Sequence, residues 1–288
     1  MKRRVKLFLV AILMFGLVIT AVGCGNADQT GKDEVADKSE EVAVFKVGLE
    51  CQYPPFNWTQ LDDSNGAVPI QGTKEFAGGY DVEIAKLIAE GLGRDLVIVK
   101  TAWDGLVPSV QSDTIDAIIA GMSPTADRKL TIDFSDNYYK SDLVMVVKRG
   151  SEFENATSIQ DFSGANVTAQ LNTFHYTVID QIEGVNKKQA MEDFAAMRVA
   201  LEAGIIDGYI SERPEGISAS AANKNFVMVG FDEGQGFEAS DDDVAIAVGL
   251  KKGNPDRELI NEILAGISEQ DRIAIMDNAI KNQPSSEE

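Results

Sequence analysis

The chain is poor in the residues on which many enzymes and metal sites depend. Its 288 residues include one histidine, His175, and two cysteines, Cys24 and Cys51. Zinc sites are built from several His and Cys ligands, and Cys-His or Ser-His catalysis needs a histidine beside a nucleophile. We therefore expect no metal site, no cofactor and no catalysis of these kinds.

Basic residues are also scarce, with 26 Lys and Arg against 46 Asp and Glu. Four of the basic residues lie within the first six positions, so the chain after residue 23 has 22 basic residues and a net charge of −24. Nucleic-acid binding requires a basic footprint, and anionic membrane surfaces attract basic segments. We expect the mature domain to bind neither, and interpret the charge as a solvated acidic surface.

The chain has one long apolar run, at residues 7–22, which follows the basic start and precedes Gly23 and Cys24. This run is short for a membrane span and typical of a signal peptide. A cysteine after a small residue at this place resembles the lipobox of bacterial lipoproteins. We therefore predict a signal peptide at residues 1–23 and a lipid on Cys24 that holds the protein to the membrane. An uncleaved anchor and a plain secretory peptide are the alternatives.

A lipidated Cys24 leaves Cys51 without a disulfide partner, so we expect Cys51 to be a buried, inert thiol. Residues 24–42 are charged and small, with almost no large apolar side chains. Such a segment cannot bury a core. We therefore predict a flexible tether at 24–42, and a disordered tail at 283–288.

From residue 42 onward, strand-like and helix-like segments alternate without a repeat. Alternation of Phe45, Val47 and Leu49 indicates a strand, whereas residues 81–92 carry apolar side chains at helical spacing, with Lys86 and Glu90 placed to pair. Further strands are expected at 96–99, 115–120, 143–147, 166–169, 205–210, 226–229 and 244–250, and further helices at 104–112, 174–182, 195–203, 214–222, 256–265 and 269–279. This order predicts parallel sheets flanked by helices.

Open α/β sheets bind ligands beyond the carboxyl ends of their strands. The polar, Gly-rich or Pro-rich segments that follow expected strands are 51–58, 121–128, 170–173 and 211–214. Among these, 121–128 carries the strongest pattern: Gly121 permits close approach of the backbone, Ser123 precedes a helix start that can hold an anion, and Arg128 can bind a carboxylate with two nitrogens. The alternative is a surface ion pair between Arg128 and Asp133.

Five segments of the chain together resemble a known family. They are YPPF at 53–56, GYDV at 79–82, WDGLVP at 103–108, IDAIIAGMS at 115–123 and DFSDNYY at 133–139. In this order and spacing they resemble the polar amino-acid-binding proteins of ABC-type importers, the bacterial extracellular solute-binding protein family 3, over about residues 43–282. The stretch between Trp58 and Phe76 is longer than is usual there, and we expect an irregular excursion or hairpin without an assigned role.

The resemblance implies an α/β fold that is periplasmic-binding-protein-like (type II). Two lobes are joined by two crossing hinge strands, with the ligand in the cleft between them. Lobe 1 would comprise residues 43–140 and 237–282, and lobe 2 residues 141–236.

The resemblance also implies two charged anchors for an amino acid. Arg128 would hold the α-carboxylate, with help from the backbone amides of Ser123 and Thr173. The α-ammonium would meet the carbonyl of Gly121, the hydroxyl of Ser123 and the carboxylate of Glu212.

The same resemblance suggests how the ligand side chain is held. Tyr53 and Trp103 would enclose it, with core packing as the alternative. Glu50 lies where binders of basic amino acids and glutamine tend to carry Asp, and favours a side chain with a hydrogen-bond donor; the alternative is a solvated charge at a strand end. Glu212 is one methylene longer than the Asp of many relatives, and its alternative role is an ion pair with Arg213.

The function implied is that of a monomeric, lipid-anchored protein on the extracellular face of the cytoplasmic membrane. It would capture a free amino acid, polar or basic, and deliver it to the permease subunits of an ATP-driven importer without catalysing a reaction. A dehydratase-like enzyme that acts on a small carboxylic acid is the alternative on the same scaffold, with Glu50 or Glu212 as acid or base. A receptor sensor is disfavoured because we expect no C-terminal membrane span.

Overall fold

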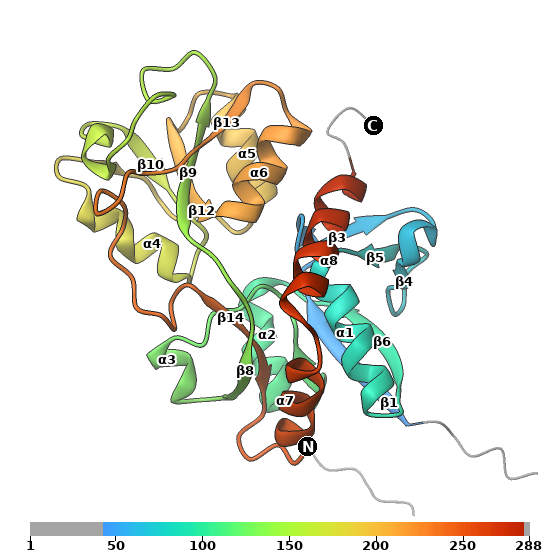
Figure 1. The fold of residues 1–288 in the computed structure, drawn as a ribbon. Helices are drawn as coiled ribbons and strands as arrows, with labels where there is room; N and C mark the ends of the chain where they lie inside the picture. The colour runs from blue at the N-terminus through green and yellow to red at the C-terminus, as the bar shows by residue number, and fades with distance from the viewer. Residues whose placement is uncertain (1–42, 285–288) are drawn as a thin grey trace, which may run out of the picture. The chain divides into compact units, whose positions relative to one another are not determined.

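Two five-stranded sheets organise the part of the chain that the computed structural model describes, residues 43–284 (Figure 1). The strand orders are β6-β1-β7-β14-β8 and β11-β10-β12-β9-β13. The first sheet consists of β1 (Val44–Leu49), β6 (Asp95–Lys100), β7 (Ala117–Ile118), β8 (Asp133–Lys140) and β14 (Ala245–Leu250). The second consists of β9 (Leu143–Lys148), β10 (Asn166–Thr168), β11 (Asn186–Lys187), β12 (Gly208–Glu212) and β13 (Phe226–Val229).

Each sheet is parallel on one side and antiparallel on the other. β1 is parallel to β6 and β7, and β10 is parallel to β11 and β12. β14 is antiparallel to β7 and β8, and β9 is antiparallel to β12 and β13. The expectation of parallel sheets is therefore wrong for half of each sheet. The reason is the path of the chain between the sheets. The chain leaves the first sheet through β8 and returns to it through β14, and it enters the second sheet through β9 and leaves it through β13.

The chain crosses between the sheets twice, as the predicted two-lobed fold requires. Residues 141–142 connect β8 to β9, and residues 230–244 connect β13 to β14. The first sheet thus combines strands from the beginning and the end of the described chain, whereas the strands of the second all lie between them (Figure 1). This topology confirms two lobes joined by two crossing segments.

Helices flank both sheets. The first lobe carries α1 (Tyr80–Gly91), α2 (Trp103–Gln111), α3 (Ala126–Lys129), α7 (Arg257–Ala265) and α8 (Glu269–Asn282). The second carries α4 (Phe174–Val178), α5 (Phe194–Glu202) and α6 (Arg213–Ala222), with the 3-10 turns η2 (Ile159–Phe162) and η3 (Ile179–Gln181). The helix expected at 174–182 is therefore shorter, because its second half tightens into a 3-10 turn.

Local sequence signals account for features of the helices. In α1, the helically spaced Ile84 and Ile88 are fully buried. In α8, the Ser268 side chain accepts the Asp271 backbone N–H as an N-cap. The expected pairing of Lys86 with Glu90 is wrong, because Lys86 bonds instead to Glu83 at 2.6 Å. Glu83 lies three residues before Lys86 and Glu90 lies four residues after it, and either spacing allows a pair on a helix. Spacing alone therefore does not determine which glutamate pairs with Lys86.

The stretch between Trp58 and Phe76 forms part of a small antiparallel sheet and not an irregular loop. Its strands are β2 (Gln52–Tyr53), β3 (Asn57–Gln60), β4 (Val68–Pro69) and β5 (Phe76–Gly78), in the order β2-β3-β5-β4, with the 3-10 turn η1 (Ser64–Gly66). A bridge between Ile70 and Ile98 ties this sheet to β6. The predicted hairpin is thus present, as the antiparallel pair β3 and β5.

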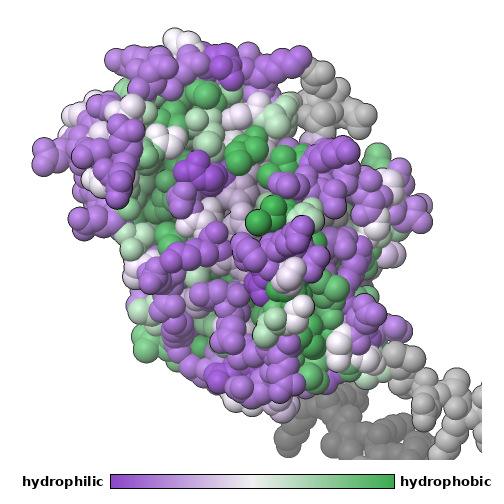
Figure 2. Space-filling model, in the orientation of Figure 1, coloured by the Kyte–Doolittle hydropathy of each residue, from purple (hydrophilic) through white to green (hydrophobic). Residues whose placement is uncertain are grey.

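The surface agrees with the acidic, polar composition. Figure 2 shows a mainly hydrophilic face, on which hydrophobic side chains appear in small groups. Within residues 43–284, the structure contains no helix that is both long enough and apolar enough to cross a membrane.

Candidate functional site

Parallel strands of both sheets end at one small cavity. Residues 50–51 follow β1, Gly121 follows β7, residues 170–173 follow β10, and Glu212 ends β12. The cavity is lined by Tyr53, Trp103, Gly121, Ser123, Arg128, Gln170, Thr173, Phe174, His175, Phe194 and Glu212. All four segments selected from the sequence therefore meet here. The remaining volume is about 20 Å³, which is room for about one water molecule.

Gly121 is a position where only glycine fits. Its φ is +63°, in the left-handed region, and a Cβ atom there would lie 2.7 Å from Cε1 of Tyr53. The backbone here closely approaches the Tyr53 ring, whereas its expected close approach to a ligand stays a prediction. The Gly121 N–H donates to the Tyr138 hydroxyl at 3.3 Å, and this hydrogen bond helps to hold the turn in place.

Arg128 is held in the cavity by contacts to both lobes. Its guanidinium donates to the Ser123 carbonyl at 2.9 Å and to the Asn172 carbonyl at 3.1 Å. It also lies over the Trp103 ring, 5.0 Å from the ring centroid, a cation–π contact. These contacts orient the side chain and leave N–H donors of the guanidinium for another partner, since it carries five.

The alternative role of Arg128, an ion pair with Asp133, is wrong. Asp133 pairs with Lys252 at 2.8 Å, and it also accepts the Gly253 N–H. Burial lowers the pKa of Arg128 to about 10, although the Glu212 carboxylate counteracts part of this shift. Arg128 therefore stays a cation at neutral pH in an environment that disfavours an unpaired charge.

Glu212 is the buried anion of the same cavity, with 4% of its surface exposed. The Tyr53 hydroxyl donates to its Oε2, and His175 Nε2 lies 2.9 Å from its Oε1. Burial alone would raise the pKa of Glu212, but His175 and these hydrogen bonds lower it below its ordinary value. The alternative of an ion pair with Arg213 is wrong, because Arg213 pairs with Asp142 at 2.7 Å.

Aromatic rings form much of the wall. The Tyr53 ring stacks on Phe194 with centroids 4.3 Å apart, and on Phe56 at 4.9 Å. Trp103 is the first residue of α2 and lies under the Arg128 guanidinium. Tyr53 and Trp103 both line the cavity, as expected, but each already contacts a protein group. Phe194 was missed because it begins a helix far from any segment that carries a binding pattern.

Glu50 lies just beyond the lining residues and reaches the site through Gln170. Its side chain accepts a hydrogen bond of 3.1 Å from Gln170 Nε2, which also donates to the Glu192 carbonyl. Burial raises the pKa of Glu50 to about 8; the Gln170 bond opposes this shift, and Asp193 and Asp104 add to it. With 7% of its surface exposed, Glu50 is not the solvated strand-end charge of the alternative interpretation.

Cys51 and His175, which the composition singled out, have different environments. Cys51 is free and buried, as expected, and burial raises the pKa of its thiol to about 12. His175 lies in the cavity and contacts Glu212, a position that the sequence analysis did not predict. Residues 43–284 contain no cluster of three or more His, Cys, Asp or Glu side chains arranged to hold a metal ion.

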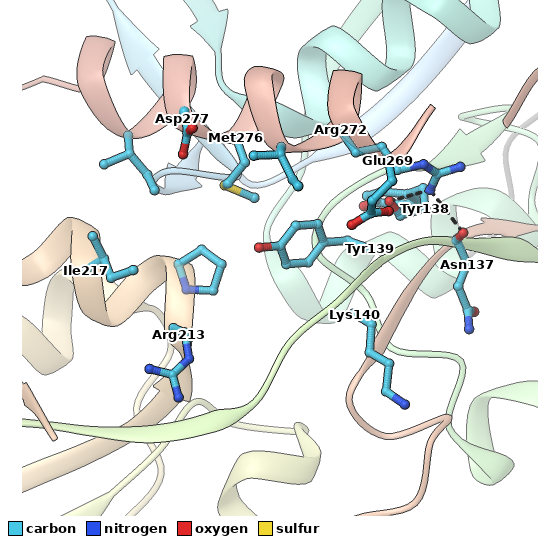
Figure 3. Close-up of a pocket in the computed structure, with 13 residues that line it drawn as sticks. Asn137, Tyr138, Tyr139, Lys140, Arg213, Ile217, Glu269, Arg272, Met276 and Asp277 are labelled. Atoms are coloured by element: carbon cyan, nitrogen blue, oxygen red, sulfur yellow. Dashed lines mark hydrogen bonds between the residues drawn. The ribbon is translucent and has the colours of Figure 1, made fainter. Parts of the chain in front are cut away.

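A larger cavity of about 490 Å³ lies elsewhere, between α6, α8 and β8 (Figure 3). Its cations already have partners. Arg272 donates to the main-chain oxygens of Asn137 and Tyr138, Arg213 pairs with Asp142, and Lys140 pairs with Asp241. The smaller cavity, in contrast, places a half-buried cation, Arg128, and a buried anion, Glu212, on one surface, and we take it as the candidate site.

Comparison with known proteins identifies relatives over most of the chain. The family described as bacterial extracellular solute-binding proteins, family 3, matches residues 45–279. The L-cystine-binding protein TcyJ of Escherichia coli (strain K12) is 28% identical over 255 residues, covering 88% of each chain. A probable histidine-binding protein of Campylobacter jejuni is 26% identical, covering 96% of this chain and 98% of its own.

A solved structure agrees with these relatives. It is an amino acid ABC transporter substrate-binding protein from Streptococcus pneumoniae, bound to L-arginine, with a TM-score of 0.73 and 25% identity. The similarity covers 83% of this chain and 94% of that one.

Proposed function

The chain belongs to the bacterial extracellular solute-binding proteins, family 3, and from that membership we propose that it captures a free amino acid and delivers it to the permease subunits of an ATP-driven importer. Proteins of this family are binding proteins of transporters and not enzymes, so the dehydratase alternative is set aside. The ATPase of the importer supplies the energy of transport. The binding protein supplies capture and selectivity.

One observation carries the proposal: half-buried Arg128 and buried Glu212 line the same cavity. A free amino acid carries one carboxylate and one ammonium at neighbouring positions, and a buried charge needs a partner of opposite sign. Arg128 serves as the carboxylate anchor, with the amides of Ser123 and Thr173. Glu212 serves as the ammonium anchor, with the Gly121 carbonyl and the Ser123 hydroxyl.

The ligand side chain extends between Tyr53 and Trp103 toward Glu50 and Gln170. A carboxylate at this end accepts hydrogen bonds, so the preferred ligand has a side chain with a donor and is polar or basic. Among the relatives, one structure is described as bound to L-arginine and another protein as a glutamine-binding protein. Both amino acids have such donors.

The lobes part to admit the ligand and close over it. A cavity of about 20 Å³ is far smaller than the few hundred Å³ of an ordinary ligand pocket, so entry requires movement. The crossing segments 141–142 and 230–244 are the hinge. We place the lobe boundaries at 43–140 with 237–282 for lobe 1, and at 141–236 for lobe 2.

Membrane attachment rests on the sequence alone. Cys24, the signal peptide 1–23, the tether 24–42 and most of the tail 283–288 lie outside the described residues. We propose that the lipid on Cys24 anchors a monomer to the extracellular face of the cytoplasmic membrane, and that the acidic domain does not itself lie on that membrane.

A thermal-shift screen tests the proposed function. The purified domain is heated with each of the twenty common amino acids, ornithine and citrulline, because a ligand at about 100 times its dissociation constant adds about 2.7 kcal/mol of stability. We expect one or a few donor-bearing amino acids to raise the melting temperature, and a much smaller response from Arg128→Ala. If no amino acid shifts the parent protein, the proposal fails. Product analysis after incubation with small carboxylic acids checks the absence of dehydratase activity.

A further inference from the structure

His175 is a buried polar group in the site to which neither the sequence nor the proposed function assigns a role. It lies on α4, two residues after Thr173, and its side chain is 10% exposed. It lines the same cavity as Arg128 and Glu212. Because the chain contains a single histidine, substitution of His175 tests the role of the imidazole without interference from another one.

The contact with Glu212 fixes which ring nitrogen carries the proton. An ionised carboxylate only accepts hydrogen bonds, so Nε2, at 2.9 Å from Oε1, is the donor. The other nitrogen, Nδ1, is buried and has no hydrogen-bond partner among residues 43–284. A single N–H, on Nε2, therefore makes this contact.

Glu212 is held at both oxygens, but by different lobes. Tyr53 donates to Oε2 from β2 in the first lobe, whereas His175 donates to Oε1 from α4, which packs on β12 in the same lobe as Glu212. When the lobes part, the Tyr53 contact is lost and the His175 contact can remain. A glutamate side chain has several rotatable bonds, so holding it in one rotamer before the ligand arrives lowers the cost of binding.

From this geometry we infer that His175 is a positioning residue that holds the Glu212 carboxylate ready for the ligand's ammonium while the cleft is open. The inference rests on the proposed function, in which Glu212 is the ammonium anchor. It adds a residue that acts through Glu212 and need not touch the ligand.

Two substitutions separate positioning from packing. His175→Gln keeps an N–H donor, whereas His175→Leu removes it. Tyr176→Phe, on the same helix and outside the cavity, is the matched control and should bind like the parent. The probe is whichever of the twenty common amino acids stabilises the parent most, and its dissociation constant is measured by calorimetry at pH 7.5.

We expect His175→Leu to weaken binding about 10- to 100-fold at pH 7.5, the usual effect of losing a hydrogen bond to a charged group. His175→Gln should stay within about threefold of the parent. The inference is overturned if His175→Leu binds like the parent, or if both variants lose affinity equally. If no amino acid stabilises even the parent, the proposed function itself has failed.

Discussion

The Gln170 side chain donates a hydrogen bond of 3.1 Å to the Glu50 carboxylate, across 120 positions of sequence and between the two lobes. Burial raises the pKa of this carboxyl to about 8 in this closed arrangement of the lobes. A cationic side chain that arrives beside it stabilises the ionised form. The Glu50–Gln170 pair therefore makes the closed site sensitive to the charge of the ligand side chain.

The first prediction concerns selectivity. Glu50→Gln should weaken a cationic amino acid such as arginine at least about tenfold, because it removes a buried charge partner, and should weaken glutamine much less. Calorimetric titration of the parent and the variant with arginine and with glutamine measures both losses. Glu192→Gln, whose side chain is exposed, is the control. If leucine, cystine or glutamate binds most tightly, the role assigned to Glu50 is wrong.

The second prediction concerns the carboxylate anchor. Arg128→Ala would leave the ligand carboxylate buried without a partner, a loss of about 2–5 kcal/mol, or roughly 30-fold to several thousand-fold in affinity. Arg128→Lys should restore only part of this, because an ammonium lacks the planar pair of donors. Calorimetric titration with the best ligand of the screen measures both variants.

Arg257→Ala is the matched control for Arg128, since Arg257 is exposed and pairs with its neighbour Glu258. It should bind like the parent. If folded Arg128→Ala keeps an affinity within about threefold of the parent, the carboxylate is held elsewhere and the assignments made by resemblance must be abandoned.

The third prediction concerns Asp81, which is fully buried beneath the site and bonded to Asn57 at 2.9 Å and to Tyr138 at 2.7 Å. Burial raises its pKa to about 6, against the counteracting hydrogen bonds. The folded state then holds this proton more tightly than the unfolded state, so the contribution to stability is full below about pH 4 and is lost as the pH rises through about 6.

Relative to Asp81→Asn, the parent should therefore lose about 2 kcal/mol of unfolding free energy between pH 4 and pH 7. Urea unfolding at several pH values measures the difference, and Asp277→Asn, on the exposed side of α8, is the control. A parent-to-variant difference that does not change with pH would contradict the assigned environment of Asp81.

The fourth prediction concerns anchoring. Cys24→Ser should release the protein from the membrane fraction, because the lipid has no other attachment point in the proposed processing. Mass spectrometry of the parent should find an acylated Cys24 as the first residue. Cys51→Ala should leave the protein in the membrane fraction, since Cys51 is buried in the domain. An intact N-terminus with an unmodified Cys24 would disprove the proposal.

The sequence by itself was sufficient to predict the segments of the site. Polar or Gly-containing residues directly after apolar runs indicated strand ends, and the carboxyl ends of parallel strands meet at one edge of a sheet. For that reason 51–58, 121–128, 170–173 and 211–214 could be chosen before their meeting point was known. Gly121 and Arg128 could be predicted in the same way, because both lie in the one short segment 121–128.

The partners of these residues were decided only by the tertiary structure. In the sequence, Asp133 lies near Arg128, but in the structure it pairs with Lys252. Arg213 is next to Glu212 in the sequence, but it pairs with Asp142. Ion pairs form between whichever opposite charges the fold brings within about 4 Å, and sequence proximity does not decide which these are.

The burial of Glu50 and the position of His175 were likewise invisible in the sequence. Glu50 is buried because Gln170, from the other lobe, closes over it, and His175 reaches Glu212 because α4 packs on β12. A pKa depends on the dielectric environment and on charges that residues distant in sequence provide. The sequence thus determined which strand-end segments meet at the cavity, and the packing of two lobes determined which further side chains join them and what their partners are.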